Sequence, residues 1–378
     1  MRNIYSILLV VAALLAGCSK PVVLPDNDVD IIPGSYIFFD AEVLGTKAAV
    51  NQYEGTTLPA GTNSVYTAIG VFGSRANGTS IFDEYSQGEN SKVDDLAVVY
   101  RDGRNGPFVY DNLALWHGGE QKFFAYYSKD LGYSKDRSGN HEFSGSWDLV
   151  DEVGTHTINN VVTPYLRYVH PLSMTEMKDV MTASASASSA GGAVKLGFVH
   201  RLFALDIVLM NDSNEPMVLK SASVEFPVYK KYFMYYQGDG ISPDVVPDTN
   251  SGQAVAGHVF FNEQKTLVAH ESVNLNSDYA QTADGFSYYT FLLVPTDTFD
   301  IQLKLTYVNK WGEDYPWESA NVTIDGGVDF EAGRHYTLKV NRKANAGTEV
   351  EFSAYIAVKD ENGNEGYWTE KDVDHTFN

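Results

Sequence analysis

The clearest hydrophobic pattern near the start of the chain is the alternation between residues 36 and 43. Apolar side chains stand at every second position, at Ile37, Phe39, Ala41 and Val43, and acidic residues occupy two of the positions between them. Successive side chains of a β-strand point to opposite faces, so this spacing predicts a strand with one face in a hydrophobic core.

Further strand patterns recur along the chain, separated by segments rich in Gly, Asn and Asp. The clearest are residues 68–72, 96–100, 122–127, 161–169 and 301–307. The 24 Tyr and 20 Phe residues also favour strands, and only residues 174–181 have a short helical pattern. Many short strands and no long helix predict an all-β chain folded as two tandem antiparallel β-sandwiches.

One internal segment has the composition of a linker. Residues 184–192 are almost entirely Ser, Ala and Gly, which supply little side-chain surface to bury. We therefore expect an N-terminal β-sandwich over residues 36–187 and a C-terminal β-sandwich over residues 188–378.

The first residues have the features of an export signal. Arg2 precedes an apolar stretch that ends at Leu15, which is too short to span a bilayer, and small residues then lead to Cys18, the only cysteine of the chain. This ending resembles a bacterial lipobox. It predicts a signal peptide over residues 1–17 and a lipid on Cys18, with palmitate among the attached chains. The alternative is an ordinary signal peptide with an incidental cysteine.

The segment after Cys18 has the composition of a tether. Residues 18–35 contain three prolines and three aspartates, which predicts an extended acidic segment between the lipid and the folded part. Without a second cysteine the chain has no disulfide framework, so packing and backbone pairing must stabilise it.

The charge of the chain narrows the choice of partners. It has 49 acidic and 27 basic residues and a formal net charge of −22. A surface of this sign repels nucleic acids, so no nucleic-acid partner is expected.

No pattern for catalysis or cofactor binding stands out. The nine histidines form no His-x-x-x-His pair, and neither a Gly-x-Ser-x-Gly turn nor a phosphate-binding glycine loop occurs. His200 lies in an apolar stretch that predicts a packed, hydrogen-bonded side chain. We therefore expect no enzyme activity, no catalytic residue, no metal site and no cofactor. A glycosidase is the alternative, because the spacing of acidic residues in the sequence does not give the distance between their carboxylates in space.

Five short segments occur in an order that resembles the fimbrillin family of Bacteroidia, the type V pilins and their accessory subunits. They are the lipobox with the early strand and residues 46–48, Ala68–Gly73, Leu115–Trp116 followed by Lys122–Tyr127, Leu196–Leu202, and Glu331–Leu338. The resemblance implies two transthyretin-like sandwiches and export as a lipoprotein to the outer membrane.

The resemblance also implies a proteolytic cut after a basic residue that follows the first strand. Lys47, followed by Ala48, is the candidate. The cut would displace the strand that carries Ile37, Phe39, Ala41 and Val43 and leave a hydrophobic groove. Lys47 stands where the family often has Arg, so an alternative is a chain that is not cut and stays anchored.

A strand from the next subunit would fill this groove. The resemblance places the donor near the C-terminus, where apolar residues alternate at Val350, Phe352, Ala354, Ile356 and Val358. The alternative is that this segment is an ordinary strand of its own domain.

These observations predict a structural subunit of a cell-surface pilus, in the stalk, at the tip or as an accessory, whose partners are other pilus subunits. The alternative is a permanently anchored surface lipoprotein that binds glycans or host ligands. The aromatic runs at residues 230–236 and 315–317 are its candidate contacts.

Overall fold

The computed structural model describes residues 31–43, 66–82, 97–101, 108–110, 113–128, 132–135, 141–144, 147–189, 192–236, 245–278, 291–295, 301–308, 312–318, 330–342, 352–359 and 365–367. Within these ranges nearly all regular structure is β-strand, so the prediction of an all-β chain is confirmed. The helical elements described there are short: η2 (Trp147–Leu149), η3 (Met174–Glu176), η5 (Thr249–Ser251) and α2 (Leu275–Asp278).

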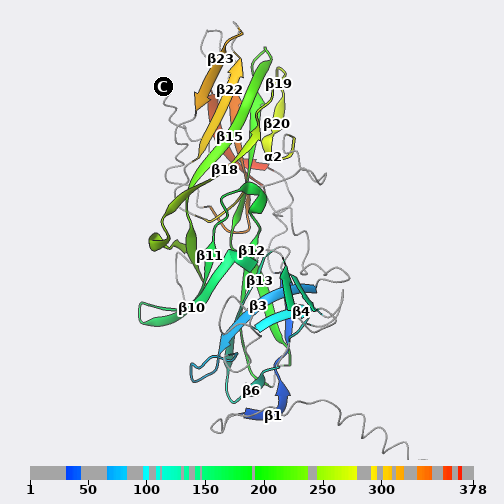
Figure 1. The fold of residues 1–378 in the computed structure, drawn as a ribbon, viewed down its shortest axis with the longest axis vertical. Coiled ribbons are helices and arrows are strands. Elements are labelled where there is room, and N and C mark those ends of the chain that lie inside the picture. The colour runs from blue at the N-terminus through cyan, green and yellow to red at the C-terminus, as the bar shows by residue number, and fades with distance from the viewer. Residues whose placement is uncertain are drawn as a thin grey trace, which may run out of the picture.

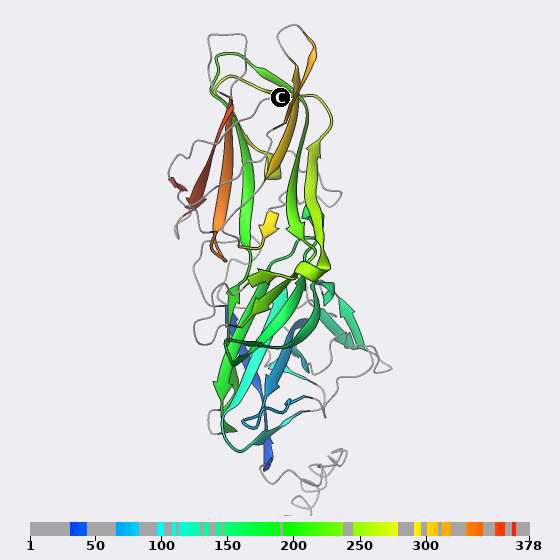
Figure 2. The same cartoon turned by 90° about the vertical axis from the view of Figure 1, so that its left-hand side faces the viewer.

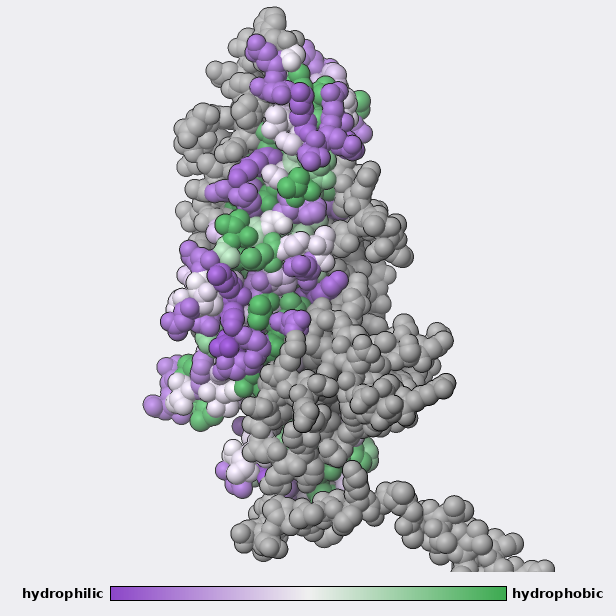
Figure 3. Space-filling model, viewed as in Figure 1, coloured by the Kyte–Doolittle hydropathy of each residue, from purple (hydrophilic) through white to green (hydrophobic). Residues whose placement is uncertain are grey.

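The strands form two halves stacked along the long axis of the molecule. Strands from the start of the chain lie in the lower half, and most strands after residue 203 lie in the upper half (Figures 1 and 2). Hydrophilic residues dominate the described surface seen in Figure 3, with smaller hydrophobic areas between them. The described strands thus form an elongated arrangement, and their surface on the face shown in Figure 3 is mostly polar.

The lower half contains a nine-stranded sheet. In spatial order its strands are β4 (Ala97–Arg101), β5 (Phe108–Val109), β2 (Phe39–Val43), β13 (Val194–His200), β12 (Val180–Ala187), β7 (Gln121–Ser128), β3 (Tyr66–Ser74), β8 (Gly132–Lys135) and β9 (His141–Ser144). Strand β3 also pairs with β4. The seven strands from β4 to β3 therefore close into a ring, which leaves none of these seven at an open edge.

A small two-stranded sheet precedes this ring. Strand β1 (Ile31–Tyr36) pairs with β6 (Leu115–His117) in antiparallel fashion. The last residues of the segment predicted as a tether, residues 31–35, are therefore in a strand. The predicted signal peptide, Cys18 and residues 19–30 lie outside the described residues.

A four-stranded sheet lies near the boundary between the halves. Its strands are β10 (Val150–Ile158), β11 (Val161–Val169), β16 (Lys231–Tyr235) and β17 (Val245–Pro247), in that order. Five residues of β16 pair with β11. The chain has already entered the upper half at this point, so β16 and β17 return to extend a sheet that began in the lower half.

The upper half is a sandwich of two sheets. One contains β20 (Ser272–Asn274), β14 (Phe203–Asn211), β24 (His335–Arg342), β25 (Phe352–Lys359) and β26 (Glu365–Tyr367), with β21 (Phe291–Leu293) also on β14. The other contains β18 (Gln253–Phe261), β15 (Met217–Tyr229), β22 (Gln302–Val308) and β23 (Asp314–Glu318), with β19 (Lys265–Leu267) also on β15. Phe226 and Phe291 join the sheets, with ring centroids 4.7 Å apart.

Antiparallel pairing, as predicted, is the rule among these sheets, with two exceptions. Strand β2 pairs in parallel with β13, and β14 pairs in parallel with β24 over eight residue pairs. Both exceptions join segments far apart in the sequence, because parallel neighbours need a long crossover between them.

The segment predicted as a linker is part of the lower sheet instead. Residues 184–187 belong to β12 and pair with residues 121–124 of β7, and β13 follows in the same sheet. The predicted boundary at residues 187 and 188 therefore falls between two neighbouring strands. Ala185 and Ala187 are partly buried against the core, whereas Ser184 and Ser186 on the other face of the strand are exposed.

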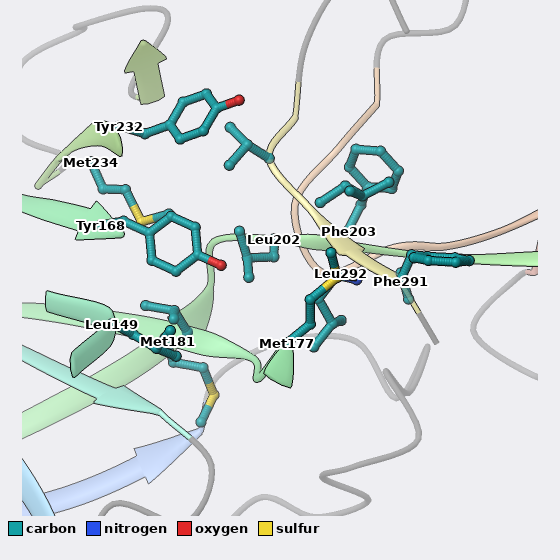
Figure 4. Close-up of a cluster of buried hydrophobic side chains, with 14 of the residues drawn as sticks. Leu149, Tyr168, Met177, Met181, Leu202, Phe203, Tyr232, Met234, Phe291 and Leu292 are labelled. Atoms are coloured by element: carbon teal, nitrogen blue, oxygen red, sulfur yellow. Dashed lines mark hydrogen bonds between the residues drawn. The ribbon is translucent and has the colours of Figure 1, made fainter. Parts of the chain in front are cut away.

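The two halves share a continuous hydrophobic core at their boundary. Figure 4 shows Tyr168, Met177, Met181, Tyr232 and Met234 beside residues of β14 and β21. Tyr236, which directly follows β16, donates a hydrogen bond from its hydroxyl to the Ala125 carbonyl at 3.0 Å. The halves are therefore interlocked, because a residue that follows upper-half strands is packed and hydrogen-bonded in the lower half.

Candidate functional site around strand β2

The segment predicted as the first strand, residues 36–43, consists of the last residue of β1, two linking residues and β2, and it shows the alternation that its sequence predicts. Ile37, Phe39 and Ala41 are 0%, 2% and 6% exposed, whereas Phe38 between them is 43% exposed. The side chain of Val43 lies outside the described residues, although its backbone pairs with Phe198. Strand β2 thus buries one face in the lower core and turns the other to solvent.

Strand β2 lies inside the ring, between two neighbours. On one side residues 39–43 pair in parallel with residues 194–198 of β13, and on the other side Phe39 pairs with Phe108 of β5. The Val194 amide donates a hydrogen bond to the Phe38 carbonyl at 2.7 Å. An internal strand uses backbone groups on both sides, so its removal would leave unpaired groups on two strands.

A tyrosine fixes the beginning of this strand. The Tyr110 hydroxyl donates to the Ile37 carbonyl at 3.0 Å and accepts a hydrogen bond from the Ala114 amide at 3.1 Å. The Ile37 amide in turn donates to the Ala114 carbonyl at 3.0 Å. Tyr110 is 4% exposed, so this link operates within the core.

Aromatic rings surround Phe39. Its ring centroid lies 5.8 Å from that of Tyr110 and 5.5 Å from that of Phe123, in the second case edge to face. Trp116 meets Phe123 edge to face at 5.8 Å on the far side. Such pairs contribute about 0.5–1.5 kcal/mol beyond the area they bury, so the place of Phe39 favours an aromatic side chain.

The other predicted site residues divide into two groups. The proposed lipid and cleavage positions, Cys18, Lys47 and Ala48, lie outside the described residues, as does Val350. The rest of the predicted donor segment is in β25, which pairs with β24 from Phe352 opposite Arg342 to Val358 opposite Tyr336. In this structure the segment is therefore a strand of its own chain, and its role as a donor stays a prediction.

The aromatic run at residues 230–236 contributes mainly to packing. Tyr232, Met234 and Tyr236 face the core and are at most 4% exposed. On the other face Phe233 lies 5.1 Å from the ring of Tyr165, and Tyr235 is only 6% exposed. The side chains of Tyr315 and Trp317, on β23, lie outside the described set.

His200 is packed and hydrogen-bonded, as its sequence context predicts. Its Nδ1 lies 2.5 Å from Oδ2 of Asp179, a carboxylate with no exposed surface. Burial lowers the pKa of His200, but the charge and the hydrogen bond of Asp179 outweigh burial and raise this pKa above its usual value. Asp179 is a buried partner of His200 that the sequence pattern did not indicate.

The contacts that hold β2 were also missed by sequence analysis. Tyr110, Ala114 and Val194 belong to separate strands or loops, and no motif connects them to residues 37–41. The one available signal was that residues 194–198 form an apolar strand pattern of matching length. Among the described residues no cluster of three metal-ligating side chains is found, and no helix there is long and apolar enough to span a membrane.

Comparisons with known proteins place the chain in a family. A family model described as Fimbrillin-like matches residues 46–357, so the chain belongs to the fimbrillin-like family. No match to this chain is found among curated proteins.

Solved structures from Bacteroides and Porphyromonas match most of this chain. One is a fimbrial protein from Bacteroides vulgatus, 14% identical, with 88% of this chain and 99% of that chain covered and a TM-score of 0.39. Another is the fimbrial anchor protein Mfa2 from Porphyromonas gingivalis, 10% identical, with 88% and 98% covered and a TM-score of 0.40.

Proposed function

We propose that this chain, a fimbria- or adhesion-related protein of the fimbrillin-like family, is a structural subunit of a cell-surface pilus. It would be exported to the outer membrane as a lipoprotein on Cys18 and assembled with other subunits by strand exchange. Loss of the strand containing Ile37, Phe39, Ala41 and Val43 would open the acceptor groove. The proposal assigns no catalysis to the chain.

The internal position of β2 is the observation that supports this proposal most directly. Removal of β2 from between β5 and β13 opens a closed ring and leaves edges that pair readily with another strand. It also exposes the apolar surface that covers Ile37 and Phe39. Refilling each of these two places would contribute about 1.5–3 kcal/mol before the entropy of association is subtracted.

The position of Lys47 suits release of β2 together with β1, which pairs with β6, and of no later described strand. Strand β2 ends at Val43, so a cut after Lys47 would detach all of it. The next basic residue, Arg75, directly follows β3, so a cut there would also remove a strand that pairs with β7. This arrangement favours Lys47 over later basic residues.

The N-terminal residue of surface-assembled material tests the proposal. Material from fibres should begin at Ala48, and Lys47→Ala should abolish this cleavage and assembly, whereas the control Lys47→Arg should retain both. Fibres whose subunits begin at lipidated Cys18 would remove cleavage from the mechanism. A monomeric surface protein with intact lipid would instead support the permanently anchored binding lipoprotein.

The lipid on Cys18 is tested separately. Cys18→Ser should abolish incorporation of labelled palmitate, because no other thiol is available in the chain. Undiminished labelling of this variant would contradict acylation at Cys18.

A further inference from the structure

Three buried polar atoms at the boundary between the halves lack a hydrogen-bond partner in the described part of the chain. They are the Tyr168 hydroxyl, Nε2 of His170 and Oδ1 of Asp179, on side chains that are at most 4% exposed. Burial of a polar atom without a partner costs free energy, and folded proteins almost always supply a partner from the chain or from ordered water. These three atoms therefore need a partner that the described side chains do not provide.

The three side chains come from neighbouring elements. Tyr168 and His170 are two residues apart at the end of β11, which places them on the same face of the sheet, and their ring centroids are 5.8 Å apart. Asp179 directly precedes β12. Burial raises the pKa of Tyr168, and the nearby Tyr232 and Asp179 raise it further, so the Asp179 carboxylate acts on the Tyr168 hydroxyl within the core.

The surroundings of the Tyr168 hydroxyl are otherwise apolar. In Figure 4 this hydroxyl points toward Leu202, where the chain passes from β13 of the lower half to β14 of the upper half. Leu202 is fully buried. The site therefore lies in the core that the two halves share.

The hydrogen bond of His170 fixes which of its nitrogens carries the proton. Nδ1 lies 2.6 Å from the Pro171 carbonyl oxygen, which can only accept, so Nδ1 is protonated and donates. Burial lowers the pKa of His170 to about 4, so the ring is neutral at neutral pH. Its Nε2 is therefore a hydrogen-bond acceptor without a donor.

Asp179 presents a second acceptor at the same boundary. Its Oδ2 lies 2.5 Å from Nδ1 of His200, which leaves Oδ1 without a donor. The Tyr168 hydroxyl carries one proton and can donate to only one acceptor at a time. Two acceptors and one hydroxyl are thus short of a donor, and a direct contact between any two of them would leave the third unpaired.

We infer that a buried water molecule lies among these side chains, donates to Oδ1 of Asp179 and Nε2 of His170, and accepts from the Tyr168 hydroxyl. Water has the two donors and the acceptor that these atoms need, and three hydrogen bonds are usual for a buried water. A metal ion fits less well, because the described residues contain no cluster of three metal-ligating side chains. The inference concerns the folded chain alone and does not depend on export or assembly.

This water completes a hydrogen-bonded path from the lower half to the upper half. The path runs from Tyr168 through the water and Asp179 to His200, the last residue of β13. Gly333 of the upper half lies against His200, because a Cβ added to Gly333 would be 3.5 Å from that of His200. The Gly333 amide also donates to the Leu202 carbonyl at 2.8 Å. The path therefore opposes rotation of one half against the other.

A crystal structure of the full chain tests the site directly. We expect an oxygen at hydrogen-bonding distance from the Tyr168 hydroxyl, Nε2 of His170 and Oδ1 of Asp179. A dry contact at this place, or a direct hydrogen bond from Tyr168 to either acceptor, would overturn the inference.

Nuclear magnetic resonance of the full chain labelled with ¹⁵N-histidine tests it in solution. Nε2 of His170 should resonate as a hydrogen-bonded acceptor in the unmodified chain, and the resonance should shift in Tyr168→Phe. Tyr232→Phe is the matched control, because the Tyr232 ring lies 6.0 Å from His170 but its hydroxyl accepts from the Tyr229 amide. The resonance of an unbonded nitrogen in the unmodified chain, or equal shifts in the two variants, would contradict a water shared by Tyr168 and His170.

The stability of Tyr168→Phe gives a third measurement, by urea unfolding of the full chain. If the hydroxyl donates to a bound water, its loss should raise the equilibrium constant for unfolding about fivefold. If the hydroxyl is buried without a partner, its removal should leave this constant unchanged or lower it, because the cost of burying the hydroxyl disappears. An unchanged or lowered constant would overturn the inference.

Discussion

Strands β2 and β25 share a side-chain pattern but differ in their surroundings. Strand β2 has a neighbour on each side in the closed ring of the lower half, and its removal opens the ring. Among the described residues, strand β25 lies next to β26, the outermost strand of its sheet in the upper half, and three of its residues pair with β26. The lower half therefore depends on having some strand in this position, whereas the upper half can lose one from near its edge.

The difference suggests a division of roles between the halves. A closed ring that loses an internal strand has a groove bordered by two unpaired strand edges. An open sheet that loses a strand near its edge has one strand fewer and a new edge. If subunits exchange strands as proposed, this difference would suit a head-to-tail polymer in which each subunit both accepts and donates a strand. The following predictions test how strongly each half depends on particular residues.

The largest effect is expected from Phe39→Ala in the uncut chain. Loss of a buried aromatic side chain costs about 3–5 kcal/mol of unfolding free energy, and urea unfolding of the full chain would measure it. The neighbouring Phe38→Ala is the control, because Phe38 is 43% exposed and its change should stay within about 0.5 kcal/mol. Equal effects of the two variants would show that β2 is not anchored by its inner face.

We expect acid to lower the free energy of unfolding through His170, which follows β11 at the boundary between the halves. Burial lowers the pKa of His170 to about 4, so between pH 6.5 and 4 the unfolded chain binds a proton that the folded chain does not. Stability is therefore highest above pH 6.5 and falls by about 3 kcal/mol as the pH drops to 4. Urea midpoints measured across this range would show the decline.

The variant His170→Gln provides the comparison for this pH dependence. Its side chain does not titrate, so it should show a smaller loss of stability between pH 6.5 and 4 than the unmodified chain. An unchanged slope in the variant would assign the acid sensitivity to other groups.

A smaller effect is expected from Tyr110→Phe. The variant removes the hydroxyl that donates to the Ile37 carbonyl and accepts from the Ala114 amide, at a cost of about 1–2 kcal/mol. Faster hydrogen exchange at Ile37 and its neighbours would localise the loss to the first strand. Tyr235→Phe, which loses a hydroxyl bonded to His156 elsewhere, should leave exchange at Ile37 unchanged.

Local sequence patterns predicted strands well where one face is buried. The alternation at residues 37–41 and at residues 301–307 was confirmed, because burial of every second side chain imposes a period of two on the sequence itself. Composition was a weaker guide. The Ser and Ala residues at 184–187 suggested a linker, but they form the end of β12 and pair with residues 121–124 of β7.

The sequence by itself determined that the chain is rich in strands, which face of the first strand is apolar, and that this pattern recurs at residues 350–356. Only the tertiary structure decided that β2 lies between β5 and β13, that it runs parallel to a strand about 150 residues away, and that Tyr110 holds its beginning. The alternation of apolar residues reflects which face of one strand is buried. Which strands become neighbours depends on backbone pairing between distant segments, and the sequence of a single strand does not specify that pairing.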